Sequence, residues 1–258
     1  MASFRSYIIC TSPRSGSTLL CKLLAATHIS GDPASYFHNP SIVDWQNEHD
    51  LSPRKGAAER DVLNAIFDAV RKRGAGGTGM FGLRLQRGSF DFLMQKIGEL
   101  HPRLSNDVER LEAAFGNILF VHLTRGDKLE QAISLVKAMQ TGLWHKAPDG
   151  TELERLSAPN DAVYNLDEIS RHVTELTALD QDWRDWFAQE KINPLQITYN
   201  ELSADPREVL ARILGQLGLD REAANGACPA VAKLADATSR DWKIRFLAET
   251  KDSSSRET

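Results

Sequence analysis

Cysteine is scarce in this chain, which has three: Cys10, Cys21 and Cys228. Their spacing is not that of metal ligands, and three cysteines cannot all pair with one another. This pattern is typical of a protein from a reducing compartment and not of a small domain stabilised by disulfides. We therefore expect no metal site.

Long apolar runs and an excess of positive charge are also missing. No run reaches the roughly 18 apolar residues that suggest a membrane span, and the N-terminus lacks the long uncharged stretch of a signal peptide. The formal net charge is −4, so no global positive field favours nucleic acid or an anionic membrane as a partner. We expect a cytoplasmic protein that binds a small molecule, with any anion site confined to one place.

The chain does have enough apolar residues for one substantial core, since 41% of its 258 residues are hydrophobic. Strand-like and helix-like segments alternate, as a parallel sheet with crossover helices requires. Strands are predicted over 7–11, 80–85, 117–124 and 194–199, and helices over 16–27, 56–73, 89–101, 165–191 and 206–217. The pattern favours an α/β fold, a P-loop-type parallel sheet flanked by helices, in a single domain over 1–258 with a frayed tail at 251–258.

The sequence also predicts which positions of one helix form its apolar face and where a long loop lies. In the helix over 56–73, the apolar residues at helical spacing are Val62, Ala65, Ile66 and Ala69. The stretch 145–160 has no clear period and contains Pro, Gly and Asp, so it is predicted to be a loop over the site.

The most informative segment is YIICTSPRSGSTLL, residues 7–20, in which an apolar strand leads through a tight polar turn into a helix. The backbone N–H groups of residues 14–18 would converge at the N-terminus of that helix. There the first N–H groups lack partners within the helix, and the helix dipole favours negative charge. The turn therefore predicts a site for a phosphate or a sulfate.

This turn departs from the nucleoside-triphosphate P-loop, G-x-x-x-x-G-K-[ST], at two positions. Thr11 replaces the first glycine, and Ser17 replaces the lysine. That lysine would reach the β- and γ-phosphates, so its loss argues against ATP or GTP hydrolysis. The cation stands instead at Arg14, whose guanidinium fork can hold a pair of phosphate or sulfate oxygens.

Three motifs in order resemble those of sulfotransferases that use 3′-phosphoadenosine 5′-phosphosulfate (PAPS). The first is P-R-S-G-S-T-L-L at 13–20, and the second is Arg125 and Ser134, about two helical turns apart after a strand. The third is the passage that contains Tyr199 and ends in Asp-Pro at 205–206. Segments 31–37, 132–144 and 183–187 are similar to the bacterial trehalose 2-sulfotransferase-like family, and the resemblance spans roughly 5–248.

The resemblance implies a PAPS site. Arg14 and the loop residues Ser15 and Gly16 would hold the phosphosulfate, and Ser17 and Thr18 would donate hydrogen bonds to the 5′-phosphate. Arg125 and Ser134 would fix the 3′-phosphate. Tyr199 would belong to the adenine pocket, and the segment 238–246 would close over the nucleotide with Thr238, Ser239 and Arg245.

The group that removes the acceptor's proton is not obvious. The family has a glutamate just before an aromatic pair, and Ser35 stands there in this chain. A serine hydroxyl is a poor base at neutral pH, so either Ser35 orients the acceptor or another group is the base. We favour His38, three residues later, with Asp32, three residues earlier, as the alternative.

Further residues could contribute from other segments. Arg84 is predicted at the carboxyl end of a strand, where α/β sheets bind ligands, and His145 could reach the site from its loop. Tyr36, Trp45 and Trp144 could stack on a sugar ring, although aromatic residues more often pack in the core.

The sequence thus predicts a PAPS-dependent sulfotransferase without a metal. Its acceptor would be a hydroxyl of a carbohydrate or small polar metabolite, such as a sugar or a glycolipid precursor. A non-catalytic sensor or scaffold that binds PAPS or its product is the alternative. An atypical P-loop kinase is a weaker one, because the lysine and a Walker-B carboxylate are missing. The acceptor's identity and the oligomeric state, a homodimer included, are left open.

Overall fold

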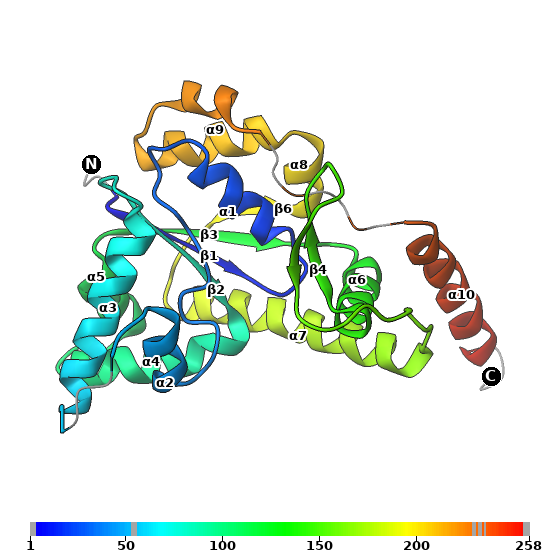
Figure 1. Cartoon of the computed structure of the whole chain (residues 1–258), viewed down its shortest axis with the longest axis horizontal. Coiled ribbons are helices and arrows are strands. Elements are labelled where there is room, and N and C mark those ends of the chain that lie inside the picture. The colour runs from blue at the N-terminus through cyan, green and yellow to red at the C-terminus, as the bar shows by residue number, and fades with distance from the viewer. Residues whose placement is uncertain (1–3, 53–55, 229–230, 232–233, 235, 255–258) are drawn as a thin grey trace.

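The computed structural model describes residues 4–52, 56–228, 231, 234 and 236–254. Four parallel strands form its main sheet in the order β2-β1-β3-β6 (Figure 1). They are β1 (Ser6–Thr11), β2 (Phe81–Gln86), β3 (Ile118–Thr124) and β6 (Leu195–Thr198). The α/β class predicted from the sequence is confirmed, and the four predicted strands form.

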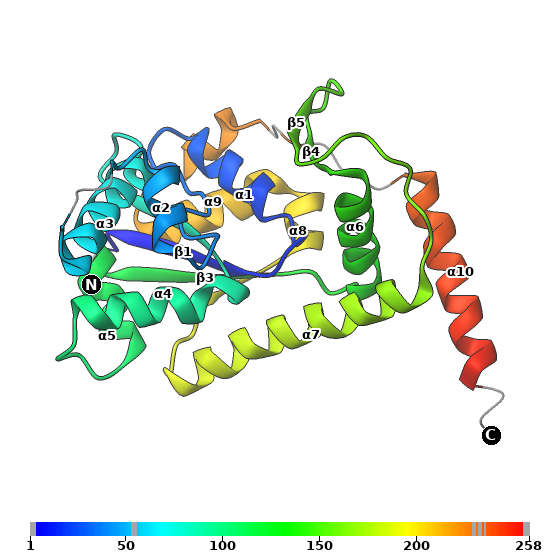
Figure 2. The same cartoon turned by 60° about the horizontal axis from the view of Figure 1, so that its bottom comes forward.

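The order of the strands explains their apolar sequences. All six residues of β1 are buried, because the strand lies between β2 and β3 and helices cover both faces of the sheet (Figure 2). The register places Thr11 beside Gln86 of β2 and Leu123 of β3. The carboxyl ends of three strands therefore lie together at one edge, which is where open α/β sheets bind ligands.

Two hydrophobic clusters attach helices to the two faces. On one face, α1 (Ser17–Ala25) and α9 (Pro206–Leu217) bury a leucine-rich cluster against Tyr7 and Ile9 of β1. On the other face, an aromatic-rich cluster that includes Phe37, Trp45 and Trp183 packs against Ile8 and Cys10. The helices around it are α3 (Glu59–Ala75), α4 (Arg87–Leu100), α5 (Asp107–Phe115) and α7 (Leu166–Gln189).

A third cluster lies beyond the end of the sheet. It joins α6 (Lys128–Thr141), which follows β3, to α7 and to the C-terminal helix α10 (Ala237–Ser254), as Figure 2 shows. Buried residues of this cluster include Ile133, Leu176 and Trp242. Shorter elements are α2 (Ile42–Glu48), α8 (Tyr199–Ala204) and the 3-10 helix η1 (Arg221–Gly226).

The prediction of a loop over 145–160 is wrong for its first part. Strands β4 (Leu143–Lys146) and β5 (Glu152–Arg155) form an antiparallel hairpin. Its turn is closed by hydrogen bonds from Ala147 N to Thr151 O at 2.7 Å and from Gly150 N to Ala147 O at 3.0 Å. The strands are short and largely polar, so they lack the alternation of apolar and polar residues that predicts a strand.

The predicted apolar face of the helix over 56–73 also needs correction. The buried side chains of α3 are Leu63, Ile66, Phe67 and Val70, while Ala65 is exposed. The larger side chains turn inward because they bury more apolar area than alanine does. The helix also continues beyond the predicted end, through Gly74, and stops at Ala75.

The end of the C-terminal helix α10 also differs from the prediction. Residues 251–254 of the predicted frayed tail belong to α10, and 255–258 lie outside the described residues. At the other end of α10, Asp236 accepts the capping hydrogen bond from Ser239 N at 2.9 Å.

The described residues include no helix that is both long and apolar enough to cross a membrane. The three thiols are free, with Cys10 and Cys21 buried and Cys228 exposed.

Candidate active site

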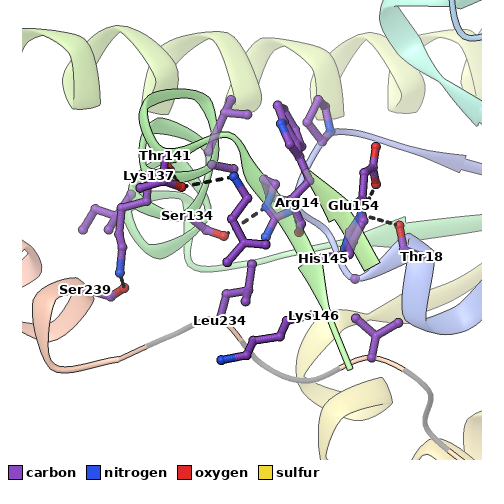
Figure 3. Close-up of a pocket in the computed structure, with 18 of the residues that line it drawn as sticks. Arg14, Thr18, Ser134, Lys137, Thr141, His145, Lys146, Glu154, Leu234 and Ser239 are labelled. Carbon is purple, nitrogen blue, oxygen red and sulfur yellow. Dashed lines mark hydrogen bonds and ion pairs between the residues drawn. The ribbon is translucent and has the colours of Figure 1, made fainter. Parts of the chain in front are cut away.

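A cavity of about 790 Å³ opens at the carboxyl edge of the sheet (Figure 3). Sites for small molecules typically measure roughly 300–1,000 Å³. One wall, called the loop wall here, consists of Pro13, Arg14, residues 16–19, Arg125 and Ser134. A second wall, called the hairpin wall, consists of residues 143–146 of β4 and residues 154–156 at the end of β5. Arg84 and Gln86 of β2 line the cavity as well.

The loop between β1 and α1, which the sequence predicts to bind an anion, contains two residues with positive φ. Arg14 has a φ of 61° and Gly16 a φ of 90°, both in the left-handed region. A Cβ at Gly16 would lie 2.7 Å from Cδ2 of Tyr199, so only glycine fits there. Helix α1 begins at Ser17 without a side-chain cap. The geometry thus leaves the helix N-terminus available to an anion.

Buried polar contacts fix this loop to the helices behind it. Ser12 donates to Asp180 Oδ1 at 2.8 Å, and Asp180 also pairs with Lys128. Gln131 donates to Pro13 O at 2.6 Å. Asp180 is almost fully buried, and a buried carboxylate is stable only when it is paired and hydrogen-bonded. The position of the loop is therefore set by α6 and α7.

Ser15 differs from the other predicted loop residues. Its side chain is fully buried, and its Oγ lies 2.5 Å from Oγ1 of Thr11. Ser15 is not among the residues that line the cavity. Its side chain therefore supports the turn from inside, while Gly16, Ser17 and Thr18 face the cavity.

Two arginines lie together at the loop wall. Arg14 donates from Nε to Ser134 Oγ at 3.1 Å and from Nη1 to Trp144 O at 2.8 Å. Burial, and next the charge of Arg125, lower the pKa of Arg14 to about 10. An anion placed between the two guanidinium groups would remove their repulsion, and the arrangement therefore favours one.

Arg125, the second of these two arginines, is buried next to Arg14. It donates from Nη1 to Arg14 O at 3.4 Å and from Nη2 to Glu130 Oε2 at 3.1 Å. Its Cζ lies 4.4 Å from the ring centroid of Tyr199, which fits a cation–π contact. Nε of Arg125 is buried, and no described residue accepts its proton. A buried donor without a partner costs free energy, which a bound anion would recover.

The C-terminal helix closes the cavity beyond Ser134. Lys137 of α6 pairs with Asp236 at 2.5 Å and donates to Ser239 Oγ at 3.0 Å, as Figure 3 shows for the contact with Ser239. Lys243 pairs with Asp127 at 2.6 Å and with Glu130 at 2.7 Å. Ser239, one of the residues predicted to close over the nucleotide, lines the cavity.

Thr238 and Arg245, predicted with Ser239, lie elsewhere. Thr238 is exposed and is not a lining residue. Arg245 pairs with Glu249 at 2.8 Å, and its Cζ lies 4.0 Å from the ring centroid of Tyr164. We therefore give neither residue a part in the site.

Arg84 connects the loop to the predicted acceptor segment. It donates from Nη1 to Thr18 Oγ1 and from Nε to Ser35 Oγ, both at 2.6 Å. Both partners are neutral hydroxyls. Ser35 lies behind Arg84 and is not a lining residue, so its hydroxyl orients the guanidinium and does not face the cavity.

The two predicted bases are placed differently. His38 lines the cavity with an exposed side chain, and its backbone carbonyl accepts from Ser89 Oγ at 2.6 Å. Asp32 is not a lining residue, and its backbone O accepts from the Tyr36 hydroxyl at 2.5 Å. Its place in the fold therefore gives no support to Asp32 as a base.

Of the aromatic residues that could stack on a sugar, one lies at the cavity. Trp144 is on the hairpin wall, and the centroid of its ring lies 5.8 Å from Cζ of Arg14. Trp45 is fully buried and Tyr36 nearly so, and both belong to the core.

The sequence indicates only that His145 could reach the site from its loop, and the structure places it on the hairpin wall. Its Nε2 lies 3.0 Å from Thr18 Oγ1 and 3.3 Å from Glu154 Oε2 (Figure 3). Burial, followed by the charges of Arg14, Arg84 and Lys22, lowers its pKa to about 4. The ring is therefore neutral at neutral pH. Sequence spacing could not reveal this contact, because it depends on the pairing of two short strands.

No group of three or more potential metal ligands occurs in the part of the chain that the structure describes.

The chain is similar to members of a known family over most of its length. The model of a family described as Stf0 sulphotransferase matches residues 6–249 of this chain. The trehalose 2-sulfotransferase of Mycobacterium tuberculosis (strain ATCC 35801 / TMC 107 / Erdman) is 29% identical over 267 residues, covering 95% of each chain. That of Mycolicibacterium smegmatis (strain ATCC 700084 / mc(2)155) is 27% identical over 258 residues, covering 93% of this chain and 94% of the relative.

Two solved structures are also similar in part. A sulfotransferase from Alicyclobacillus acidocaldarius aligns with a TM-score of 0.43 and 16% identity, over 96% of this chain and 93% of the other. The sulfotransferase domain of the Synechococcus PCC 7002 olefin synthase aligns with a TM-score of 0.41 and 16% identity, over 87% and 77%.

Proposed function

The chain belongs to the Stf0 sulphotransferase family, and on that premise we propose that it transfers a sulfuryl group from PAPS to a hydroxyl of a sugar. The observation that carries the proposal is the pair Arg14 and Arg125 beside Ser134 at the N-terminus of α1. Two guanidinium groups and a free helix N-terminus favour a ligand with more than one anionic group. PAPS is such a ligand.

The loop wall would bind the donor at two points. Residues 16–18 would donate hydrogen bonds to the 5′-phosphosulfate, together with Arg14. Arg125 and Ser134 would hold the 3′-phosphate, and the unpartnered Nε of Arg125 provides a donor for it. Tyr199, packed against Arg125 and over Gly16, would form one side of the adenine site.

PAPS supplies the activated sulfuryl group, and its transfer to the acceptor oxygen leaves 3′,5′-ADP. The protein's part is to position the reacting groups and to stabilise negative charge on the leaving oxygen. Arg14 and the N–H groups of the loop meet both needs, because they surround the place where that oxygen would lie. This arrangement requires no metal ion.

The names of the two relatives and a tryptophan that lines the cavity support a sugar as the acceptor. Both curated relatives are named for trehalose, which supports a sugar hydroxyl, and a glycolipid precursor belongs to the same class. Trp144 on the hairpin wall is placed to stack on a sugar ring. Ser35 stands where the family has a glutamate, so we do not carry trehalose itself over to this chain.

The test is a turnover assay with PAPS and a panel of sugars, trehalose included. We expect 3′,5′-ADP and a sulfated sugar to form in equal amounts, measured by mass spectrometry. Tight binding of 3′,5′-ADP with no transfer to any sugar, phenol or sterol would favour the non-catalytic sensor instead. ATP consumption that depends on Mg²⁺ would favour the kinase alternative and contradict the proposal.

A further inference from the structure

The proposed transfer leaves one chemical requirement without a residue, since the acceptor hydroxyl must lose its proton as its oxygen attacks sulfur. The cavity has three carboxylates, Glu130, Glu154 and Asp236. Glu130 is paired with Arg125 and Lys243, and Asp236 with Lys137. These two carboxylates already stabilise cations, which makes them poor proton acceptors. Glu154 is paired instead with a histidine, His145.

The hairpin register brings this pair together. His145 of β4 and Glu154 of β5 are direct cross-strand partners, and both line the cavity. The side chain of His145 is 20% exposed and that of Glu154 46%. The imidazole is therefore held by the wall, while the carboxylate remains in contact with solvent and can stabilise a protonated ring without a large desolvation cost.

Two contacts of Nε2, with Thr18 and with Glu154, bear on the state of the ring. Arg84 can only donate, and it donates to Thr18 Oγ1 at 2.6 Å. The Thr18 hydroxyl proton is then free to point at His145 Nε2, 3.0 Å away. A ring with its proton on Nδ1 accepts this hydrogen bond, whereas a ring with its proton on Nε2 donates to Thr18 Oγ1 or to Glu154 Oε2, 3.3 Å away. The form with its proton on Nδ1 is the one that can act as a base, because its Nε2 is an accepting nitrogen next to the predicted 5′-phosphosulfate position.

We propose that His145 is the general base of the transfer, in place of the carboxylate missing at Ser35, and that Glu154 stabilises its protonated form. The proposal rests on the proposed function. When the donor is bound, the Thr18 hydroxyl donates to the phosphosulfate and releases Nε2. His145 Nε2 then accepts the acceptor's hydroxyl proton, and Glu154 stabilises the imidazolium.

The step balances in atoms and charge. The O–H bond of the acceptor breaks and its proton moves to Nε2, while the acceptor oxygen forms a bond to sulfur. The bond between sulfur and the bridging oxygen breaks, and its electron pair leaves on the 5′-phosphate of 3′,5′-ADP. His145 returns its proton to water between turnovers through the exposed side of Glu154.

His38 is the rival residue in the cavity. Its ring makes no hydrogen bond within the described residues, and its side chain is exposed. It also lacks a carboxylate partner there, so neither its orientation nor its charged form is supported by the fold. The geometry favours His145 over the base that the sequence suggested.

The first test compares His145→Gln with His38→Gln, with His101→Ala, away from the cavity, as a control. We expect His145→Gln to lower kcat by about 100-fold or more, with the acceptor KM and the affinity for 3′,5′-ADP within about twofold. Glu154→Gln should lower kcat by less, about five- to tenfold. Unchanged kcat in His145→Gln, or a larger loss in His38→Gln, would overturn the proposal.

The second test does not depend on turnover. Groups that face His145 are Arg14 of the loop, Arg84 of β2, Lys22 of α1 and Glu154 of β5. NMR of ¹³C-labelled histidine should give a low pKa, about 4, in the free protein. It should rise when 3′,5′-ADP binds, because a nearby anion favours the imidazolium.

The two tests separate the inference from the proposed function. If 3′,5′-ADP binds but the pKa of His145 does not move, His145 is not beside the donor and the inference fails alone. If 3′,5′-ADP does not bind to the wild-type protein, the donor site itself is wrong.

Discussion

The two walls of the cavity are built in opposite ways. The loop wall joins the central strands of a buried sheet, and Asp180, Gln131 and Trp183 hold its loop from behind. The hairpin wall consists of two four-residue strands without a sheet behind them. Its bonds to the body include Arg14 Nη1 to Trp144 O at 2.8 Å and Arg155 Nη1 to Thr141 O at 2.6 Å.

This difference fits the two parts of the proposed reaction, which are donor binding on the loop wall and proton removal from the acceptor on the hairpin wall. The proposed binding of the donor's anionic groups depends on backbone geometry that the whole fold fixes, and we therefore assign it to the loop wall. The proposed base and the tryptophan proposed to stack on the sugar lie on a hairpin that is separate from the main sheet. Arg14 connects the two, because its guanidinium contacts Ser134 on one side and Trp144 on the other.

The largest effect is expected from Gly16→Ala on the loop wall. The residue has a φ of 90°, and a Cβ would meet the Tyr199 ring at 2.7 Å, so the turn must change shape. We expect affinity for 3′,5′-ADP to fall by about 100-fold or more, measured by calorimetry. Gly79→Ala is the matched control, because a Cβ at Gly79 would meet open space. We expect this variant to bind 3′,5′-ADP as tightly as the wild type does. Normal binding by Gly16→Ala would mean that the loop does not hold the nucleotide.

Arg14→Ala should have the next largest effect, because it removes a charged donor from the loop wall and a link to the hairpin wall. The loss of a charge-assisted contact corresponds to about 1.5–3 kcal/mol, or roughly 10- to 150-fold in donor affinity. Arg14→Lys keeps the charge but not the fork, and we expect it to recover only part of the affinity. Equal affinity in Arg14→Ala and the wild type would remove Arg14 from the donor site.

Gly142→Ala should have a smaller effect that is confined to the hairpin wall. Gly142 has a φ of 71°, and a Cβ would collide with Ser157, at the base of the hairpin. We expect kcat to fall about tenfold as the hairpin shifts, while 3′,5′-ADP binds within about twofold of wild type. If Gly142→Ala lowered the affinity for 3′,5′-ADP as much as it lowered kcat, the two walls would not be independent.

The loop wall could be predicted from the sequence because its determinants are local. An apolar strand, a Pro-Arg-Ser-Gly turn and an apolar-periodic helix specify a backbone conformation within a short segment, and the structure forms it. Arg125 and Ser134 could be added because their order and spacing after a strand resemble those of sulfotransferases that use PAPS. The burial of Ser15 could not be predicted, since its partner Thr11 depends on how tightly the turn closes.

The hairpin wall could not be predicted for a physical reason. Its strands, LWHK and ELER, contain few apolar residues and are not fully buried, so no hydrophobic pattern specifies them. The contact of His145 with Thr18 joins residues 127 positions apart. Pairing across the hairpin and packing against the loop together create it, and neither is encoded in a local motif.

The most direct test of the central claim is calorimetric titration of the wild-type protein with 3′,5′-ADP and with 5′-AMP. The two nucleotides differ in the 3′-phosphate, which Arg125 and Ser134 are proposed to hold. The account predicts that 3′,5′-ADP binds at least about tenfold more tightly, since one charge-assisted contact corresponds to about 1.5–3 kcal/mol. Equal affinity for the two nucleotides would contradict it.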